Sequence, residues 1–467
     1  MIIDIQNCGE YLNISHFNEE GDLDFLKLDI PEDQRFTWER CSAGDRARDR
    51  NWLTWDGHPV KKVYGKRYDK YRIQQIINDT DPEKTRVLWE YQRPKKYYVD
   101  IEVEITDNAV DSLDTENAPN RVLSIGIATD SHKLILLGLD PLDDDQILAI
   151  EERVNKHLES MGDTWTVRYM QFQSEFDMLY TFMAKLSKKM GLITGWNWFG
   201  YDWPYLINRC KRLNIDPSII SPSKVLKGNR SIPQHLLMVD YLEIYKKFDR
   251  VIKIKENNKL DYVGEQATGI KKIHYQGTLR DLYQSSFSEF IAYNGIDCAL
   301  LYYIDKKIAT MDTFFKIAMV TGSEIDRTLS PVWTTELMMM RKFFERNRVF
   351  VDERKETNHE KFEGAFVKTP ILGLHEWVTC FDFASLYPNT LIQWCISPEN
   401  YKGKNLINPK PEWIKTASGA FFGGIEESPI LRDIILNLYA RRKLKKKEML
   451  EIKLEIDRLE KELKKSS

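Results

Sequence analysis

Short apolar runs separated by polar loops mark residues 97–197 and predict a domain built from strands and helices. Runs rich in β-branched residues indicate strands, and apolar residues spaced three and four apart indicate helices. The expected strands are 97–103, 122–128, 134–137, 166–172 and 192–197. The expected helices are 144–161, 175–190 and one that begins near Trp203.

The expected helix at 175–190 has the fullest sequence signature. Ser174 can cap its first turn, Asp177 follows three residues later, and one apolar stripe is formed by Leu179, Phe182, Met183 and Leu186. Three strands followed by alternating helices and strands predict a mixed α/β sheet. This order is the one found in ribonuclease-H-like folds, although many other α/β domains share it.

The later part of the chain has a different pattern. Residues 310–353 read as helical and then irregular, and the apolar run 377–383 predicts a buried strand. From about residue 431 to the end, the chain predicts one long charged helix. Its apolar positions recur at helical spacing: Met449, Ile452, Ile456, Leu459 and Leu463.

The composition favours several large cores and leaves the binding partner open. A chain of 467 residues is enough for about three domains, and 42% hydrophobic residues argue against general disorder. The net charge of −3 neither indicates nor excludes nucleic acid. The six cysteines form no Cys-x-x-Cys pair, and the chain has no run of about 18 apolar residues. We therefore expect a soluble cytoplasmic protein with no zinc site and no membrane partner.

Three groups of acidic residues carry the candidate chemistry. Asp100 and Glu102 lie two apart on an expected strand, so both side chains leave the same face of the sheet. Two such acids suit a hard divalent cation, although a lone pair of this kind is more often exposed to solvent. Asp202 follows an apolar strand where a helix should begin, which is also typical of a helix cap. Tyr293 and Asp297 share one helix face, as an ordinary surface pair could.

In this order, the three groups resemble the exonuclease motifs of family B DNA polymerases. Those motifs are Asp-x-Glu, Asn-x₃-(Phe/Tyr)-Asp and Tyr-x₃-Asp, and this chain has Tyr201 where Phe is more usual. The resemblance implies a 3′→5′ exonuclease that binds two Mg²⁺ or Mn²⁺ ions and cleaves DNA. It assigns the metal ions to Asp100, Glu102, Asp202 and Asp297, and it places Tyr293 beside the attacking water.

The chemistry explains why such residues are needed. A phosphodiester is anionic and repels hydroxide, so two metal ions about 4 Å apart would activate the water and neutralise the leaving 3′ oxygen. The Tyr293 phenol, with an ordinary pKa of about 10, would stay neutral and orient the water by a hydrogen bond. The expected product is a deoxynucleoside monophosphate.

A second resemblance points to the polymerase module of the same family. Residues 381–388, Phe-Asp-Phe-Ala-Ser-Leu-Tyr-Pro, are similar to the first polymerase motif, Asp-x-x-Ser-Leu-Tyr-Pro, and residues 364–367 are similar to a segment just before the palm. The resemblance implies that Asp382 binds the metal ions of the incoming dNTP. The backbone near Ser385 and Leu386 would approach its phosphates, and Tyr387 would pack under its sugar.

The basic run 441–446 resembles the start of the fingers of these enzymes. The resemblance assigns triphosphate binding to Arg442 and Lys446, where Arg can clamp a phosphate with two hydrogen bonds and Lys acts as a point charge. A solvated charge run on a long helix is the competing interpretation, because such runs are common.

After Pro388, the sequence contains neither the Lys-x₃-Asn-Ser-x-Tyr-Gly motif nor the Asp-Thr-Asp motif of the family. We therefore expect the N-terminal part of a polymerase with T-even-phage character, completed by a C-terminal chain that carries the rest of the palm, fingers and thumb and possibly binds a sliding clamp. A truncated product is the alternative. The expected domains are an N-terminal domain at 1–94 with 310–353 returning to it, the exonuclease at 95–309, a partial palm at 354–429 and the first fingers helix at 430–467.

The leading hypothesis is a DNA polymerase component with proofreading activity, acting on primer-template and single-stranded DNA in the cytoplasm of an infected bacterial cell. Residues 224–230 are candidates for separating primer from template. The alternatives are a non-catalytic DNA-binding scaffold subunit and a stand-alone exonuclease. The intact set of acids and Tyr293 argues against the scaffold, and the palm and fingers segments argue against the stand-alone enzyme.

Overall fold

The computed structural model describes residues 1–42, 44–45, 48–90, 92–106, 109–186, 191–252, 256–351 and 366–466. The chain forms two compact units: residues 1–34 with 79–337, and residues 35–78 with 338–467. This division runs through the segment 1–94, for which we expect one domain, and residues 352–365, at the start of the expected palm, lie outside the described residues. The four-domain division remains a prediction.

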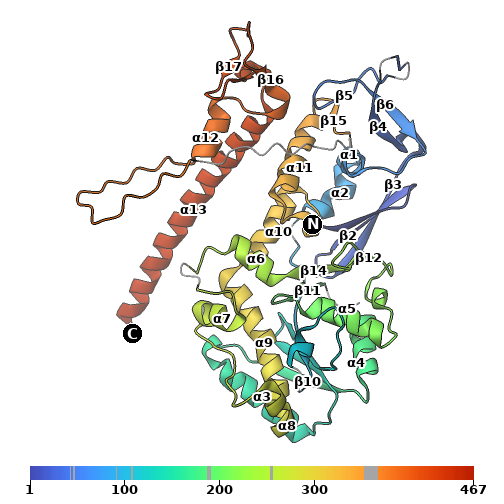
Figure 1. Ribbon diagram of the computed structural model, residues 1–467, viewed down its shortest axis with the longest axis vertical. Helices are drawn as coiled ribbons and strands as arrows, with labels where there is room; N and C mark the ends of the chain where they lie inside the picture. Colours follow the sequence, from blue (N-terminus) through green and yellow to red (C-terminus); the bar gives the residue numbers. More distant parts are fainter. Residues whose placement is uncertain are drawn as a thin grey trace. The chain divides into compact units, whose positions relative to one another are not determined.

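A six-stranded sheet forms the centre of the first unit (Figure 1). Its strands β7, β8 and β9 are antiparallel neighbours, and β10, β11 and β14 each run parallel to the strand beside them. The spatial order is β10-β9-β8-β7-β11-β14. The bounds are β7 Lys96–Val103, β8 Val122–Thr129, β9 Lys133–Gly138, β10 Thr166–Gln171, β11 Leu192–Gly195 and β14 Leu237–Asp240. The mixed α/β sheet expected from the sequence is confirmed.

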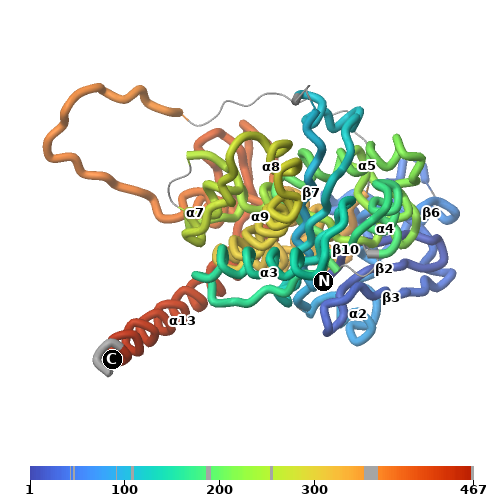
Figure 2. Tube along the Cα trace, turned by 90° about the horizontal axis from the view of Figure 1, so that it is seen from below, coloured from blue at the N-terminus to red at the C-terminus, as the bar shows by residue number. Residues whose placement is uncertain are grey.

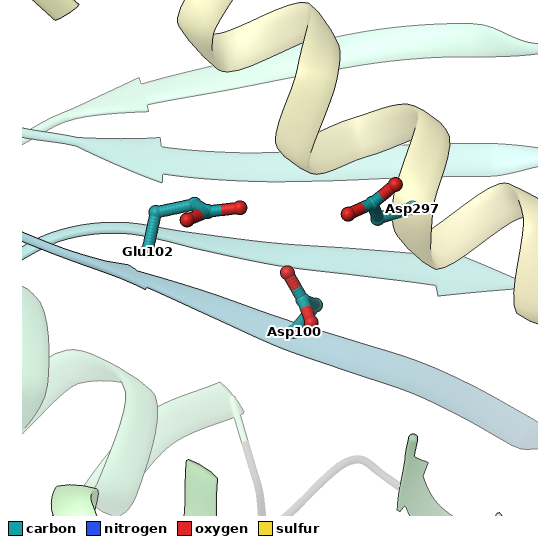
Figure 3. Close-up of side chains that lie close together, drawn as sticks. All are labelled: Asp100, Glu102 and Asp297. Carbon is teal, nitrogen blue, oxygen red and sulfur yellow. The ribbon is translucent and has the colours of Figure 1, made fainter. Parts of the chain in front are cut away.

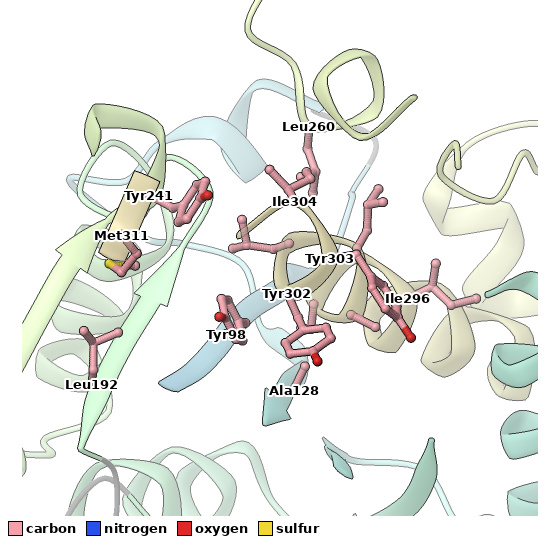
Figure 4. Packing of buried hydrophobic residues seen from close by; sticks show 14 of the residues in the cluster. Tyr98, Ala128, Leu192, Tyr241, Leu260, Ile296, Tyr302, Tyr303, Ile304 and Met311 are labelled. Atoms are coloured by element: carbon pink, nitrogen blue, oxygen red, sulfur yellow. The ribbon is translucent and has the colours of Figure 1, made fainter. Parts of the chain in front are cut away.

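Helices cover both faces of this sheet, so the central strand β8 is buried along its whole length. The apolar side of α9 (Phe287–Ile308) packs on β7 and β8, with α3 (Asp144–His157) and α7 (Leu260–Thr268) beside it (Figures 2 and 4). The opposite face packs against α4 (Glu175–Thr181) and α5 (Asp202–Arg212). The remaining helices of this unit are α2 Pro82–Trp89, α6 Tyr241–Phe248, α8 Leu279–Ser285 and α10 Thr310–Thr321.

The helix ends follow local sequence. Asp143 and Gln146 form a capping box at α3, and the Ser174 side chain accepts a hydrogen bond from the Asp177 amide as expected. The expected helix 175–190 is α-helical through Thr181 and continues as a π-helical turn, Phe182–Leu186, beyond which residues 187–190 lie outside the described part. The expected helix 144–161 ends at His157, and the expected strand 192–197 ends at Gly195.

A separate three-stranded sheet, β1 (Ile2–Asn7), β2 (Tyr11–Phe17) and β3 (Leu23–Asp29), also belongs to the first unit. Polar contacts attach it to the hairpin β12–β13 (Leu226–Lys227 and Ile232–Pro233) and to the residues that follow. Asp4 pairs with Lys227 and accepts a hydrogen bond from the His235 amide. This hairpin lies within and just after the segment 224–230, whose role in strand separation remains a prediction.

The second unit contains the paired strands β4 (Phe36–Arg40) and β6 (Val60–Tyr64), and a short parallel pair, β5 (Leu53–Thr54) and β15 (Arg348–Val349). Helix α1 (Lys70–Asp79) and the last turns of α11 (Pro331–Phe344) accompany them. Further along, α12 (Leu386–Gln393) packs on α13 (Ile430–Ser466), beside a small sheet, β16 Tyr401–Lys404, β17 Ile414–Lys415 and β18 Ala420–Phe422. The long charged helix expected at the C-terminus is confirmed as α13.

The expected buried strand at 377–383 is wrong. These residues have no regular secondary structure, and Val378, Phe381 and Phe383 are 75%, 90% and 77% exposed. A strand needs a neighbouring strand for its hydrogen bonds and a packed face for its apolar side chains.

In the part of the chain that the structure describes, no helix is both long and apolar enough to cross a bilayer.

Candidate metal centre

Three carboxylates converge on one face of the central sheet. Asp100 and Glu102 project from β7, and Asp297 projects toward them from α9 (Figure 3). One oxygen from each carboxylate lies within 4.8 Å of the others. The spacing of two along a strand and the packing of α9 on that strand together produce this cluster.

Asp202 lies near the cluster but is not a member of that group of three. It is the first residue of α5, is buried, and accepts a hydrogen bond from the Ile101 amide at 3.2 Å. Its carboxylate is therefore held against the backbone of β7, between the two acidic positions of that strand. The structure thus places all four predicted acids on or beside β7. The carboxylates of three of them, Asp100, Glu102 and Asp297, converge.

A lysine that the sequence analysis does not include completes the cluster. Lys272 Nζ lies 2.5 Å from Asp297 Oδ2 and 3.4 Å from the Tyr293 hydroxyl. Burial lowers the pKa of Lys272, but the negative charges of Asp297 and Asp100 outweigh burial and raise that pKa above its usual value. Burial raises the pKa of Tyr293, so its phenol is neutral near pH 7.

The carboxylates are costly to ionise without a cation. Burial, followed by the charge of Asp297, raises the pKa of Asp100 to about 7. Burial also raises the pKa values of Glu102 and Asp202 well above their usual range, and the charge of Asp100 adds to both. Asp297 Oδ1 is buried without a hydrogen-bond partner among the described residues. Converging, partly unpartnered oxygens of this kind fit a hard divalent cation.

The metal-free chain is expected to lose stability as the pH rises from about 4 to about 7. The Asp100 pKa is near 3.8 in the unfolded chain and about 7 in the folded one, so folding retains a proton between these values. That contribution is complete below the unfolded pKa and is lost as the pH rises through the folded pKa. Thermal unfolding in EDTA would measure it, with Asp100→Asn as the variant that cannot lose this proton. If the unfolding midpoints of the two proteins differed equally at about pH 4 and at about pH 7, the expectation would be contradicted.

The residues that resemble the first polymerase motif, and the basic residues of α13, lie in the second unit. Asp382 and Tyr387 are exposed, and Ser385 adopts a left-handed conformation just before α12. Arg442 and Lys446 lie one turn apart on α13 and line one surface pocket, together with Tyr439, Ala440 and Lys443. No metal cluster is found around Asp382 among the described residues.

Two segments of the chain match known protein families. Residues 90–263 match the family described as DNA polymerase family B, exonuclease domain, and this segment contains Asp100, Glu102 and Asp202. This part of the chain, which contains three of the four predicted acids, is thus similar to the exonuclease domain of family B DNA polymerases. Residues 332–463 match the family described as DNA polymerase family B. The chain belongs to the family B DNA polymerases.

Curated relatives include two phage enzymes and an archaeal one. The chain is 29% identical to the DNA-directed DNA polymerase of Escherichia phage RB69 over 263 residues, which are 54% of this chain and 29% of the relative. It is 26% identical to the DNA-directed DNA polymerase of Enterobacteria phage T4 over 306 residues, 60% of this chain and 34% of the relative. It is 28% identical to a DNA polymerase of Archaeoglobus fulgidus over 227 residues, 47% of this chain and 28% of the relative. The chain spans about a third of the length of these relatives.

Proposed function

We propose that this chain is a metal-dependent 3′→5′ DNA exonuclease that also supplies the first part of a DNA polymerase site. The convergence of Asp100, Glu102 and Asp297 is the observation that carries the nuclease proposal. Asp202, the first residue of α5, is held against β7 by the Ile101 amide and completes the set of acids that the resemblance assigns to two Mg²⁺ or Mn²⁺ ions. Bound divalent cations would neutralise the phosphodiester and lower the pKa of the attacking water.

The side chains around the carboxylates have distinct roles in this proposal. The neutral Tyr293 phenol can orient the attacking water by a hydrogen bond. Lys272 holds Asp297 through an ion pair, and its positive charge offsets part of the negative charge of the cluster. The same ammonium can approach a phosphate oxygen when the DNA strand enters, since Lys272 remains partly exposed (27%).

The polymerase part of the proposal concerns Asp382, Ser385, Leu386 and Tyr387, together with Arg442 and Lys446. Asp382 would bind the metal ions of the incoming dNTP, and the two basic residues of α13 would bind its triphosphate. The match of residues 332–463 to the family supports these roles. Many apolar side chains of this unit are exposed, including Phe381 and, on α13, Met449 and Ile452. Such surface favours a further polypeptide segment that covers it.

The covering segment would carry the rest of the palm, the fingers and the thumb. Its second carboxylate motif would complete the metal site at Asp382, and a sliding clamp could bind through it. A separate C-terminal chain, as the sequence analysis expects, remains a prediction. Primer-template and single-stranded DNA are the proposed substrates, and the cytoplasm of an infected bacterial cell is the proposed location.

The test uses the purified chain, Mg²⁺ and single-stranded DNA labelled at its 5′ end. We expect stepwise shortening from the 3′ end, release of deoxynucleoside monophosphates, and complete loss of shortening in EDTA. With primer-template and dNTPs, this chain alone is expected to give no extension, because the described residues show no metal-binding cluster around Asp382. DNA binding without shortening would favour the scaffold function, and extension would contradict the assignment of an incomplete polymerase site.

A further inference from the structure

Asn294 fills a closed position between the acidic cluster and strand β8. Its side chain is 0% exposed. Its amide nitrogen Nδ2 donates to Asp100 Oδ2 at 2.9 Å and approaches the Asp100 carbonyl oxygen at 3.4 Å, while Ser124 Oγ donates to its Oδ1 at 3.0 Å. The reversed amide would set its oxygen against a carboxylate oxygen, so these contacts define one orientation.

Strand β8 provides a space that fits this side chain. In the ladder with β7, Gly126 lies opposite Asp100, and Ser124 lies opposite Glu102. A Cβ atom on Gly126 would lie 2.6 Å from Asn294 Oδ1 and 2.8 Å from Cys298 Sγ. The φ of Gly126 is not positive, so the position needs glycine for space and not for its backbone conformation. One strand thus supplies both the gap and the hydroxyl that orient the amide.

We propose that Asn294 is a positioning residue that holds the Asp100 carboxylate ready for the divalent cation, with Ser124 fixing the amide. This inference rests on the proposed nuclease function. The terminal torsion of an aspartate is soft, so a free Asp100 carboxylate would sample many orientations. The Nδ2 hydrogen bond holds one oxygen and leaves the other for the cation. A neutral amide does this without adding charge to a cluster of three carboxylates.

Metal affinity separates this role from a merely structural one. Asn294 also joins α9 to the sheet, so its loss should lower the thermal unfolding midpoint in either case. Positioning predicts an additional loss of affinity for the cation, since groups that orient a metal ligand typically contribute about 10- to 100-fold. A purely structural residue of the same unit should change stability and leave that affinity unaltered.

The experiment measures Mn²⁺ binding to the full chain by electron paramagnetic resonance, together with thermal unfolding. Asn294→Leu keeps much of the side-chain volume and removes both hydrogen bonds, and we expect its Mn²⁺ affinity to fall by about 10-fold or more. Ser124→Ala, which frees the amide to reorient, should show a smaller fall in the same direction. The matched control is Thr310→Val, which loses the buried hydrogen bond to the Tyr241 hydroxyl (2.9 Å) and should bind Mn²⁺ as the wild type does.

The outcomes distinguish this inference from the function on which it rests. If the wild-type chain binds Mn²⁺ and shortens DNA while Asn294→Leu and Ser124→Ala keep its affinity, the positioning role is overturned and the nuclease stands. If the wild type neither binds Mn²⁺ nor shortens DNA, the nuclease proposal fails, and the positioning role of Asn294 fails as well. Should Asn294→Leu not fold, Ser124→Ala decides, and an unchanged affinity there also overturns the role.

Discussion

Replacement of both Asp100 and Glu102 by alanine is expected to reduce the 3′→5′ nuclease rate by about a thousand-fold or more, which corresponds to about 4 kcal/mol of lost transition-state stabilisation. The two side chains supply two of the three converging carboxylates. The two acids that remain, Asp202 and Asp297, could not hold the cations in place. Single-turnover shortening of labelled DNA at saturating Mg²⁺ would measure the loss.

The double variant should still fold, because it removes one half-buried and one buried carboxylate that are costly to ionise, which offsets the lost hydrogen bond to Asn294. Circular dichroism would check this point. The matched control replaces the exposed Asp144 and Asp145 of α3 by alanine, which also removes two carboxylates from the same unit. A control that loses activity equally, or a double variant that keeps it, would contradict the assignment of the site.

The second large effect is on stability. Glu175→Ala is expected to destabilise the chain by about 3–5 kcal/mol, because it leaves the Arg209 guanidinium buried without its carboxylate. Glu175 receives two hydrogen bonds from Arg209, at 2.8 and 2.6 Å, and one from the Val122 amide at 2.7 Å. The Arg209 and Glu175 side chains are 8% and 7% exposed. Chemical denaturation, followed by circular dichroism, would measure the change.

The chain contains its own control for this prediction. Arg121 and Glu104 form a similar pair with two hydrogen bonds, but their side chains are 50% and 31% exposed. Glu104→Ala is therefore expected to cost less than about 1 kcal/mol, as exposed ion pairs usually do. Equal losses in the two variants would show that burial does not decide the effect.

The sequence predicts the central sheet because short-range patterns determine it. The alternation and β-branching of 97–103 and 122–128 are visible in the chain, and the parity of Asp100 and Glu102 on a strand places them on one face. Lys272 could not be found in the same way. It lies between α7 and α8 in a segment without periodicity, and its contact with Asp297 depends on how that segment crosses α9.

Asn294 and the run 377–383 show two other limits of prediction from the sequence. Asn294 lies three residues before Asp297 on the same helix, a spacing that could have suggested a shared face, but its function depends on a gap at Gly126 on a distant strand. The run 377–383 has the length and apolar content of a buried strand. Whether such a run is buried depends on partner strands, which the run itself does not encode.

The first unit is formed by two separate segments of the chain, and this affects how the nascent chain folds on the ribosome. Strand β1 pairs with its neighbour β2, but its other contacts come from residues made much later: Asp4 pairs with Lys227, and β1 packs against the short helix Ile325–Arg327. At about 5–20 residues per second, roughly 15 to 60 s of translation separate the synthesis of β1 from that of its last partner. During that interval, the first strands must remain available without pairing with other nascent chains.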